Sequence, residues 1–241
     1  DTRIYLLDSL SLDIQPLTPK RTNSPCWSPD GSQLVYQRGV YESSAGAFYN
    51  NTHLEMLTLA DQKTNTVPID FDEDIYPLRW AEDGIYFMSV LRTSIHLLRV
   101  DTAGGTPEVV TPKDTPGFRS WEFSFDAAAK TCACIPATVD RFSEVAVIDL
   151  GSGTLTTLTD YDAPAREWNL PSSEVMAWTS SDGTEIEGVL TKPADFDPNK
   201  QYPLLVIIHG GPTGISTPTR LGYHTLRIYP LYQWAAQGAI I

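Results

Sequence analysis

The sequence predicts two folds in one chain: an incomplete β-propeller over residues 1–159, then the beginning of a domain built on a parallel β-sheet covered by helices. The first observation is a repeat of short strands behind a recurring aromatic–Asp–Gly turn. The second is an unbroken apolar run at residues 204–208 that ends in a glycine-rich turn. Residues 160–174, which include Pro164 and Pro171, are expected to link the two parts.

The propeller prediction comes from three related turns. Cys-Trp-Ser-Pro-Asp-Gly at 26–31 recurs as Arg-Trp-Ala-Glu-Asp-Gly at 79–84 and, more weakly, as Glu-Phe-Ser-Phe-Asp-Ala at 122–127. The spacing is 53 and then 43 residues between the aromatic positions, the period of propeller blades. Each turn is followed by three short apolar strands, expected at 34–36, 54–57 and 66–69, at 85–88, 95–98 and 108–110, and at 132–135, 145–148 and 155–158. With the strand that carries the turn, each repeat has four strands.

Two more strands, at 3–8 and 15–18, are expected to be the outer pair of a preceding blade, which makes about three and a half blades in all. The repeated turn has a structural role, since Asp30-Gly31 suits a tight turn and Trp27 is expected to pack between blades. We assign it no chemistry.

One repeat carries a long loop, residues 39–51, with several aromatic side chains and Glu42. Long loops in compact repeats are often functional. No motif gives Glu42 a substrate-binding role, however, and a packing or interface loop is the favoured interpretation.

The second part begins with a predicted hairpin, strands at 175–183 and 185–193 around an Asp182-Gly183 turn. The apolar run 204–208 then suits a buried parallel strand. The turn that follows, His-Gly-Gly-Pro-Thr-Gly at 209–214, lets the backbone approach another molecule closely. In serine hydrolases with a doubly wound sheet, this is the place of the oxyanion hole. The alternative is a glycine-rich turn without chemistry.

A helix is expected at 229–237, with Leu231, Trp234 and Ala235 on one face and Gly238 at its end. Residues 239–241 are expected to begin the next buried strand.

These motifs together resemble the start of the catalytic domain in the prolyl oligopeptidase family of serine peptidases. The matching segments are Ser-Asp-Gly-Thr-Glu-Ile-Glu-Gly-Val-Leu at 181–190, Lys-Pro at 192–193, Tyr-Pro-Leu-Leu-Val at 202–206 and His-Gly-Gly-Pro at 209–212. The most similar branch is that of acylaminoacyl peptidases and dipeptidyl aminopeptidases. The resemblance implies a propeller followed by an α/β-hydrolase domain, here residues 175–241, and hydrolysis of oligopeptide, acyl-peptide or dipeptide-releasing substrates. It further implies that Gly211 supplies an oxyanion-hole N–H and that Gly210 gives the backbone its close approach. It implies no cofactor and no metal.

The catalytic triad of such an enzyme is missing from these residues. No serine lies in a Gly-x-Ser-x-Gly motif, and the nearest approach is Gly-Ile-Ser-Thr-Pro at 214–218. His53 and His96 fall in propeller strands, His209 belongs to the glycine-rich turn, and His224 has no identifiable partner. We therefore expect a longer protein, cut before its nucleophile, and an inactive chain when these residues stand alone.

The composition argues against several classes of binding partner. Thirty acidic against 17 basic residues give a net charge of −13, which argues against nucleic acid and anionic membrane surfaces. No apolar run is long enough to span a bilayer. Three cysteines do not make a disulfide framework, and Cys132 and Cys134 are expected to be buried side chains and not metal ligands.

The expected partners are an oligopeptide substrate and the remainder of the same protein or a second processed chain. A homo-oligomer is also compatible with the open sheet edges. Two alternatives are a TolB-like propeller binding module and an α/β-hydrolase esterase. The glycine-rich turn argues against the binding module.

Overall fold

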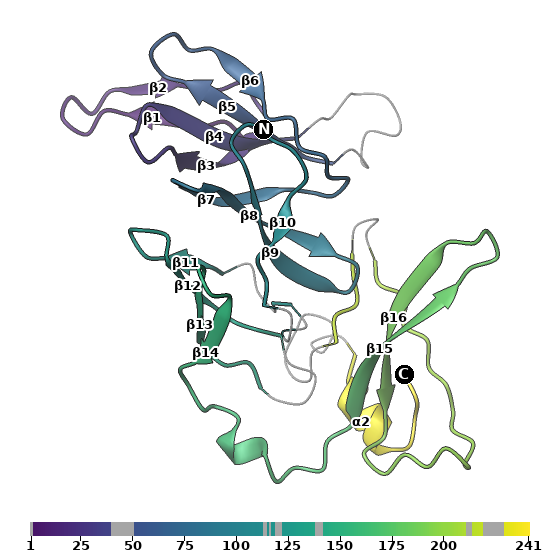
Figure 1. Ribbon diagram of the computed structural model, residues 1–241. Coiled ribbons are helices and arrows are strands. Elements are labelled where there is room, and N and C mark those ends of the chain that lie inside the picture. Colours follow the sequence, from purple (N-terminus) through teal and green to yellow (C-terminus); the bar gives the residue numbers. More distant parts are fainter. Residues whose placement is uncertain are drawn as a thin grey trace. The chain divides into compact units, whose positions relative to one another are not determined.

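The computed structural model describes residues 2–39, 51–112, 115, 117–118, 122–137, 142–210, 214–218 and 229–241. The chain divides into two compact units. One consists of Asp1–Val90, His96–Thr111 and Phe125–Lys130, and the other of Leu91–Ile95, Pro112–Ser124 and Thr131–Ile241. Within the described residues, the named strands form three four-stranded and two two-stranded sheets (Figure 1).

The predicted repeat of four strands is confirmed. A hairpin of β1 (Tyr5–Leu7) and β2 (Ile14–Pro16) precedes the first complete sheet. That sheet is a meander of β3 (Thr22–Trp27), β4 (Gln33–Arg38), β5 (His53–Thr58) and β6 (Thr64–Thr66). The second contains β7 (Tyr76–Ala81), β8 (Gly84–Leu91), β9 (Ser94–Val100) and β10 (Glu108–Val109). The third contains β11 (Ser124–Phe125), β12 (Thr131–Cys134), β13 (Ala146–Asp149) and β14 (Thr154–Thr157). Consecutive strands neighbour each other in every sheet, which is the order of a propeller blade.

The recurring Asp–Gly turn owes its shape to local hydrogen bonds. At the first turn, the hydroxyl of Ser28 donates to Asp30 Oδ1 at 2.7 Å, and the N–H of Ser32 donates to the same oxygen at 3.0 Å. These donors lower the pKa of Asp30 to about 2. Gly31 has φ +71°, in the left-handed region that glycine adopts without strain. The turn is thus a structural device, as the sequence predicts.

The two anchor tryptophans differ in burial, which corrects one expectation. Trp80 is 6% exposed, whereas Trp27 is 48% exposed and is not enclosed between blades. Each is paired across the ladder with a buried aliphatic residue, Ile85 and Leu34 respectively. Around the two strands that carry them, β3 and β7 pack against each other, and Ile4 and Leu17 pack against the cluster that contains Leu34.

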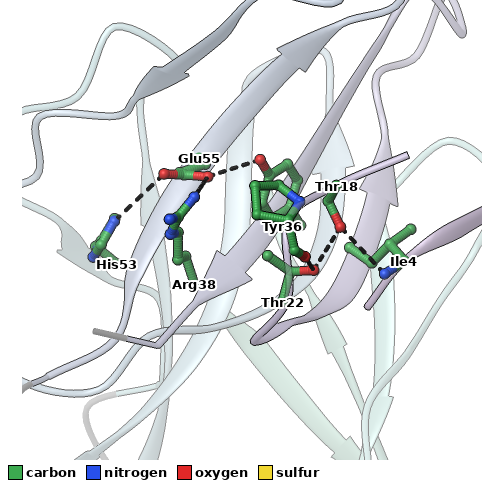
Figure 2. Close-up of polar contacts among 8 residues, drawn as sticks. Ile4, Thr18, Thr22, Tyr36, Arg38, His53 and Glu55 are labelled. Atoms are coloured by element: carbon green, nitrogen blue, oxygen red, sulfur yellow. Dashed lines mark hydrogen bonds and ion pairs between the residues drawn. The ribbon is translucent and has the colours of Figure 1, made fainter. Parts of the chain in front are cut away.

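The core of the first sheet passes from apolar to polar along one face. Leu34, Tyr36 and Leu57 pack together, with Ile4, Leu17 and Leu59 against them. Next along this face, the buried Tyr36 hydroxyl donates to Glu55 Oε2 at 2.7 Å (Figure 2). Arg38 donates to the same oxygen at 3.2 Å, and His53 Nε2 lies 3.8 Å from Glu55 Oε1. Glu55 is therefore buried with charged and hydroxyl partners, as a carboxylate in a core must be.

The two cysteines predicted to be buried are buried. Cys132 and Cys134 lie two residues apart on β12 and are almost inaccessible. Burial raises the pKa of Cys132 to about 12 and that of Cys134 to about 11, so both thiols are protonated at neutral pH. The described residues contain no group of three or more His, Cys, Asp or Glu side chains arranged to hold a metal ion.

The segment after the third sheet is held to that sheet by two carboxylates. Glu144 accepts N–H bonds from Tyr161 at 3.0 Å and from Asp162 at 2.8 Å, and a hydroxyl bond from Thr159. Asp162 in turn accepts the N–H of Phe142 at 2.8 Å. A short 3₁₀ turn, Ala163–Ala165, follows, and β15 begins at Ser172.

The last part of the chain opens with the predicted hairpin of β15 (Ser172–Thr179) and β16 (Glu185–Lys192). Gly183 has φ +90° in the Asp182-Gly183 turn. The helix α2 (Leu231–Ala236) lies near the end of the chain. None of the helices in the described ranges has the length or apolar character needed to cross a bilayer.

Candidate oxyanion turn and its sheet

The glycine-rich turn follows a strand segment that joins the β15–β16 hairpin through residues 240 and 241. Thr191 of β16 and Ile241 exchange two N–H···O bonds, of 2.8 and 3.0 Å, which is the antiparallel pattern. On the other side, Ile240 donates to Pro203 at 2.9 Å and accepts from Leu205 at 2.8 Å, a parallel pairing in which Leu204 and Ile240 are partners. The order across the sheet is therefore β15, β16, residues 240–241 and residues 203–205.

A parallel pairing needs a crossover between its strands, and α2 lies in that crossover. Ala235 is fully buried, while Leu231 and Trp234 are half-buried, so the predicted apolar face is confirmed. The helix ends as predicted at Gly238, which has φ +90°. Gly238 donates to Ala235 at 2.9 Å and Ala239 donates to Trp234 at 3.0 Å. These two bonds form a Schellman cap, which turns the chain directly into the segment that pairs with residues 203–205.

The expectation that residues 204–208 are buried is wrong for this chain. Leu204, Val206 and Ile208 are 68%, 70% and 86% exposed. Leu204 forms a single bridge and not an extended ladder. The apolar character of the run is that of a strand covered on both faces, but the described residues place no covering layer on these three side chains.

The base of this segment is fixed by an aromatic contact. Phe196 and Tyr202 stack with ring centroids 5.2 Å apart, and the Tyr202 hydroxyl accepts the N–H of Asp197 at 2.7 Å. Lys192 Nζ lies 5.2 Å from the centre of the Phe196 ring and 2.6 Å from Glu174. The loop between β16 and residue 203 is thereby folded onto itself. No sequence motif signals these contacts.

The turn itself is compact. A Cβ atom added to Gly214 would lie 2.3 Å from the carbonyl oxygen of Gly210 and 2.9 Å from Nδ1 of His209. Real Cβ atoms essentially never approach so closely, so position 214 must be glycine for the turn to close. A Cβ on Gly210, by contrast, would meet no atom of the described residues within 4 Å.

The remaining predicted residues are placed as follows. Gly211 and His224 lie outside the described residues, as do Glu42 and the aromatic side chains of its loop. His53 and His96 lie in β5 and β9, as expected. Burial lowers the pKa of His96, which favours the neutral form of this half-buried side chain. No role in the turn was predicted for Gly214 from the sequence. Its position three residues after the glycine pair 210–211 is the signal that could have suggested one.

Comparison with known proteins agrees with this architecture. No protein-family model matches the chain. A probable dipeptidyl-peptidase 5 of Aspergillus niger is 25% identical over 207 residues, which cover 82% of this chain and 27% of that protein. The chain therefore spans only about a quarter of the length of such relatives.

Solved structures share the fold along almost the whole chain. The acylaminoacyl peptidase of Pyrococcus horikoshii superposes with a TM-score of 0.70 and 18% identity, over 99% of this chain and 34% of that one. An acylaminoacyl peptidase in complex with Z-Gly-Gly-Phe-chloromethyl ketone gives a TM-score of 0.71 at 19% identity, with the same coverage.

By its fold the chain resembles one class of proteins, the α/β-hydrolases that carry a propeller. Within that class the chain resembles the prolyl oligopeptidase family, in the branch of dipeptidyl and acylaminoacyl peptidases, as its motifs predict.

Proposed function

We propose that the whole protein is a serine peptidase of the prolyl oligopeptidase type, to which these residues contribute propeller blades and the oxyanion side of the hydrolase sheet. The observation that carries this proposal is the strand order, with a glycine-rich turn directly after a strand paired in parallel. In open α/β sheets, ligands bind at the carboxyl ends of such strands. In this proposal residues 1–159 are the propeller part, 160–174 the linker and 175–241 the start of the hydrolase domain.

In this mechanism the turn stabilises negative charge. A serine outside these residues attacks the scissile carbonyl carbon, and the carbonyl oxygen becomes an oxyanion in the tetrahedral intermediate. The N–H of Gly211 donates to that oxygen, and a second donor comes from the residue after the serine. Gly210 contributes by its lack of a side chain, which lets the backbone come close to the carbonyl of the substrate. His209, whose ring lies against Gly214, shapes the turn and transfers no proton.

The substrate class is an oligopeptide, with an acyl-peptide or a dipeptide-releasing reaction as the narrower possibilities. Support comes from the relatives, which are named dipeptidyl-peptidases, and from the neighbouring acylaminoacyl peptidase that was solved with a peptidyl chloromethyl ketone. A propeller in front of the active site fits small peptides, because it limits access by folded proteins.

The first test uses a fluorophosphonate probe, which labels an activated serine. The full-length protein should be labelled and should hydrolyse acyl-peptide or aminoacyl-naphthylamide substrates. The 241 residues alone should not be labelled, since they lack the nucleophile elbow. A full-length protein that is neither labelled nor active on any of these substrates would remove the proposal.

The second test addresses the turn. Gly211→Val in the full-length protein keeps the backbone N–H, but its β-branched side chain should push the loop from the acyl carbon and misplace that donor. The value of kcat should therefore fall by about 10²–10³, the usual cost of losing one oxyanion donor. KM should change much less, because the contact is strongest in the transition state. Unchanged kcat in a folded variant would show that Gly211 has no role in catalysis and that the turn is only structural.

A further inference from the structure

A two-residue turn makes an ion-pair contact with a strand almost a hundred residues later. The turn Arg92-Thr93 joins β8 to β9. Arg92 Nη1 donates to Glu185 Oε1 at 2.6 Å and to Glu187 Oε1 at 2.7 Å. Thr93 Oγ1 lies 3.3 Å from Glu187 Oε2 and donates to it. The turn and β16 belong to the same compact unit.

The backbone of the turn is unusual for the residue it carries. Arg92 has φ +56°, in the left-handed region that L side chains rarely adopt. Two-residue hairpin turns of this kind favour Gly, Asn or Asp, and an arginine there costs free energy. The arginine at this position brings a side chain that binds two carboxylates, which a glycine could not do.

The two carboxylates are placed to receive it. Glu185 and Glu187 are two residues apart on β16, so both side chains lie on one face of the hairpin. The side chain of Glu187 is only 18% exposed, against 57% for Glu185. The opposite face carries Trp178, whose ring would lie 3.1 Å from a Cβ added to Gly188. The turn therefore contacts the face of the hairpin that carries the two glutamates, and Glu187 is the less exposed of the two.

The contact is connected to the glycine-rich turn along β16 and then through backbone hydrogen bonds between neighbouring segments. Glu187 is followed on β16 by Thr191, which pairs with Ile241. Ile240 pairs with the segment at 203–205, and that segment runs directly into Gly210. A displacement of β16 would be passed along this ladder to the turn, because neighbouring strands share their backbone bonds.

We propose that Arg92 and Thr93 form a clasp on Glu185 and Glu187 that positions the β15–β16 hairpin, and through it the strand that carries the glycine-rich turn. Arg92 is a positioning residue, since it acts through β16 and not on the substrate. The proposal deepens the proposed function, but its structural part stands independently of peptidase activity.

The test is hydrogen exchange of residues 172–192 in the full-length protein. Arg92→Ala should speed exchange of these amides by about three- to tenfold, the range for losing charge-assisted bonds that are partly exposed. Arg99→Ala is the matched control, since Arg99 also binds two carboxylates, Asp83 at 2.9 Å and Glu108 at 2.7 Å, and all three residues belong to the other compact unit. Arg99→Ala should leave exchange in 172–192 unchanged.

Glu187→Gln weakens the same ion pair by removing the charge of the carboxylate partner. It replaces Arg92→Ala in the exchange measurement if Arg92→Ala does not fold. Combined with Arg92→Ala, it should add little, because both changes break one interaction. The effect should also shrink in about 1 M salt, where exposed charges are screened. Exchange in 172–192 that is unchanged by Arg92→Ala, matched by Arg99→Ala, or accelerated additively by the two changes would overturn the clasp.

A second readout is kinetic. If the whole protein is the proposed peptidase, Arg92→Ala should lower kcat more than it changes KM, because the misplaced donor acts in the transition state. Accelerated exchange with unchanged kcat would support the positioning of the hairpin by Arg92 and contradict an effect on the glycine-rich turn. If the protein has no peptidase activity, the exchange measurements alone decide the clasp.

Discussion

Gly214→Ala in the full-length protein should damage catalysis far more than folding. The added methyl group would lie 2.3 Å from the carbonyl oxygen of Gly210 and 2.9 Å from Nδ1 of His209. Even a tight contact of 3.0 Å to the oxygen requires a movement of roughly 0.7 Å, and an ordinary contact about 1 Å. The backbone oxygen cannot swing aside like the end of a flexible side chain, so the turn must shift as a unit.

The size of the effect follows from where the shift occurs. A misplacement of about 1 Å in a catalytic constellation can cost about 10²-fold in rate. That corresponds to about 2.7 kcal/mol in the transition state. The folded state should be affected less, because Gly214 follows the strand segment and lies outside the hydrogen bonds that join residues 203–205, 240–241 and β16.

The assay is kcat, KM and melting temperature for Gly214→Ala beside the parent protein. Gly151→Ala is the control, because a Cβ there would meet only Asp149 Oδ1 at an ordinary 3.5 Å. We expect kcat to fall about a hundredfold for Gly214→Ala and to stay unchanged for Gly151→Ala. Full activity of a folded Gly214→Ala protein would show that the turn can open without loss and that its compactness is irrelevant to function.

Three further outcomes are expected. Desolvation alone raises the pKa of Glu144, but the bonds from Thr159, Tyr161 and Asp162 outweigh it and lower the pKa. Its contribution should therefore be fully present above the pKa of an unfolded glutamate, about 4.3, and be lost as the pH falls through the lowered pKa of the folded protein. Glu144→Gln should accordingly speed proteolysis within 160–171 at pH 7 and have a progressively smaller effect as the pH falls below about 4, and an effect that does not change with pH would contradict this. Tyr36→Phe should destabilise the protein by about 1–2 kcal/mol in chemical denaturation, since it removes a donor from the buried Glu55; a neutral result would show that Arg38 suffices. The 241 residues alone should associate through their exposed apolar side chains, which sedimentation would reveal as concentration dependence, whereas a concentration-independent monomer with cooperative melting would disprove it.

Local patterns carried most of the prediction of secondary structure. Alternating apolar residues and Asp–Gly turns depend on neighbours within a few positions, so the four-strand repeat and the 182–183 hairpin could be recognised directly. The helix at Leu231–Ala236 and its end at Gly238 were equally local, because a left-handed glycine terminates a helix through bonds to the preceding turn.

The candidate site could be predicted only in part. The glycines at 210 and 211 stood out because they follow an apolar run, and this motif pointed to the oxyanion role. Gly214 did not stand out, since its need to be glycine arises from the fold of the turn against Gly210 and His209. The same holds for Arg92, whose partners Glu185 and Glu187 are far away in sequence.

The sequence by itself determined the strand repeat, the turns, the hairpin and the helix end, all of which rest on contacts between near neighbours. Only the tertiary structure decided that residues 240–241 lie between β16 and residues 203–205, and that Trp27 is exposed while Trp80 is buried. The physical reason is that a strand's hydrogen bonds and a side chain's burial depend on whichever distant segment comes to lie beside them. A backbone N–H can pair with any free carbonyl, so its partner is chosen by the packing of the whole unit.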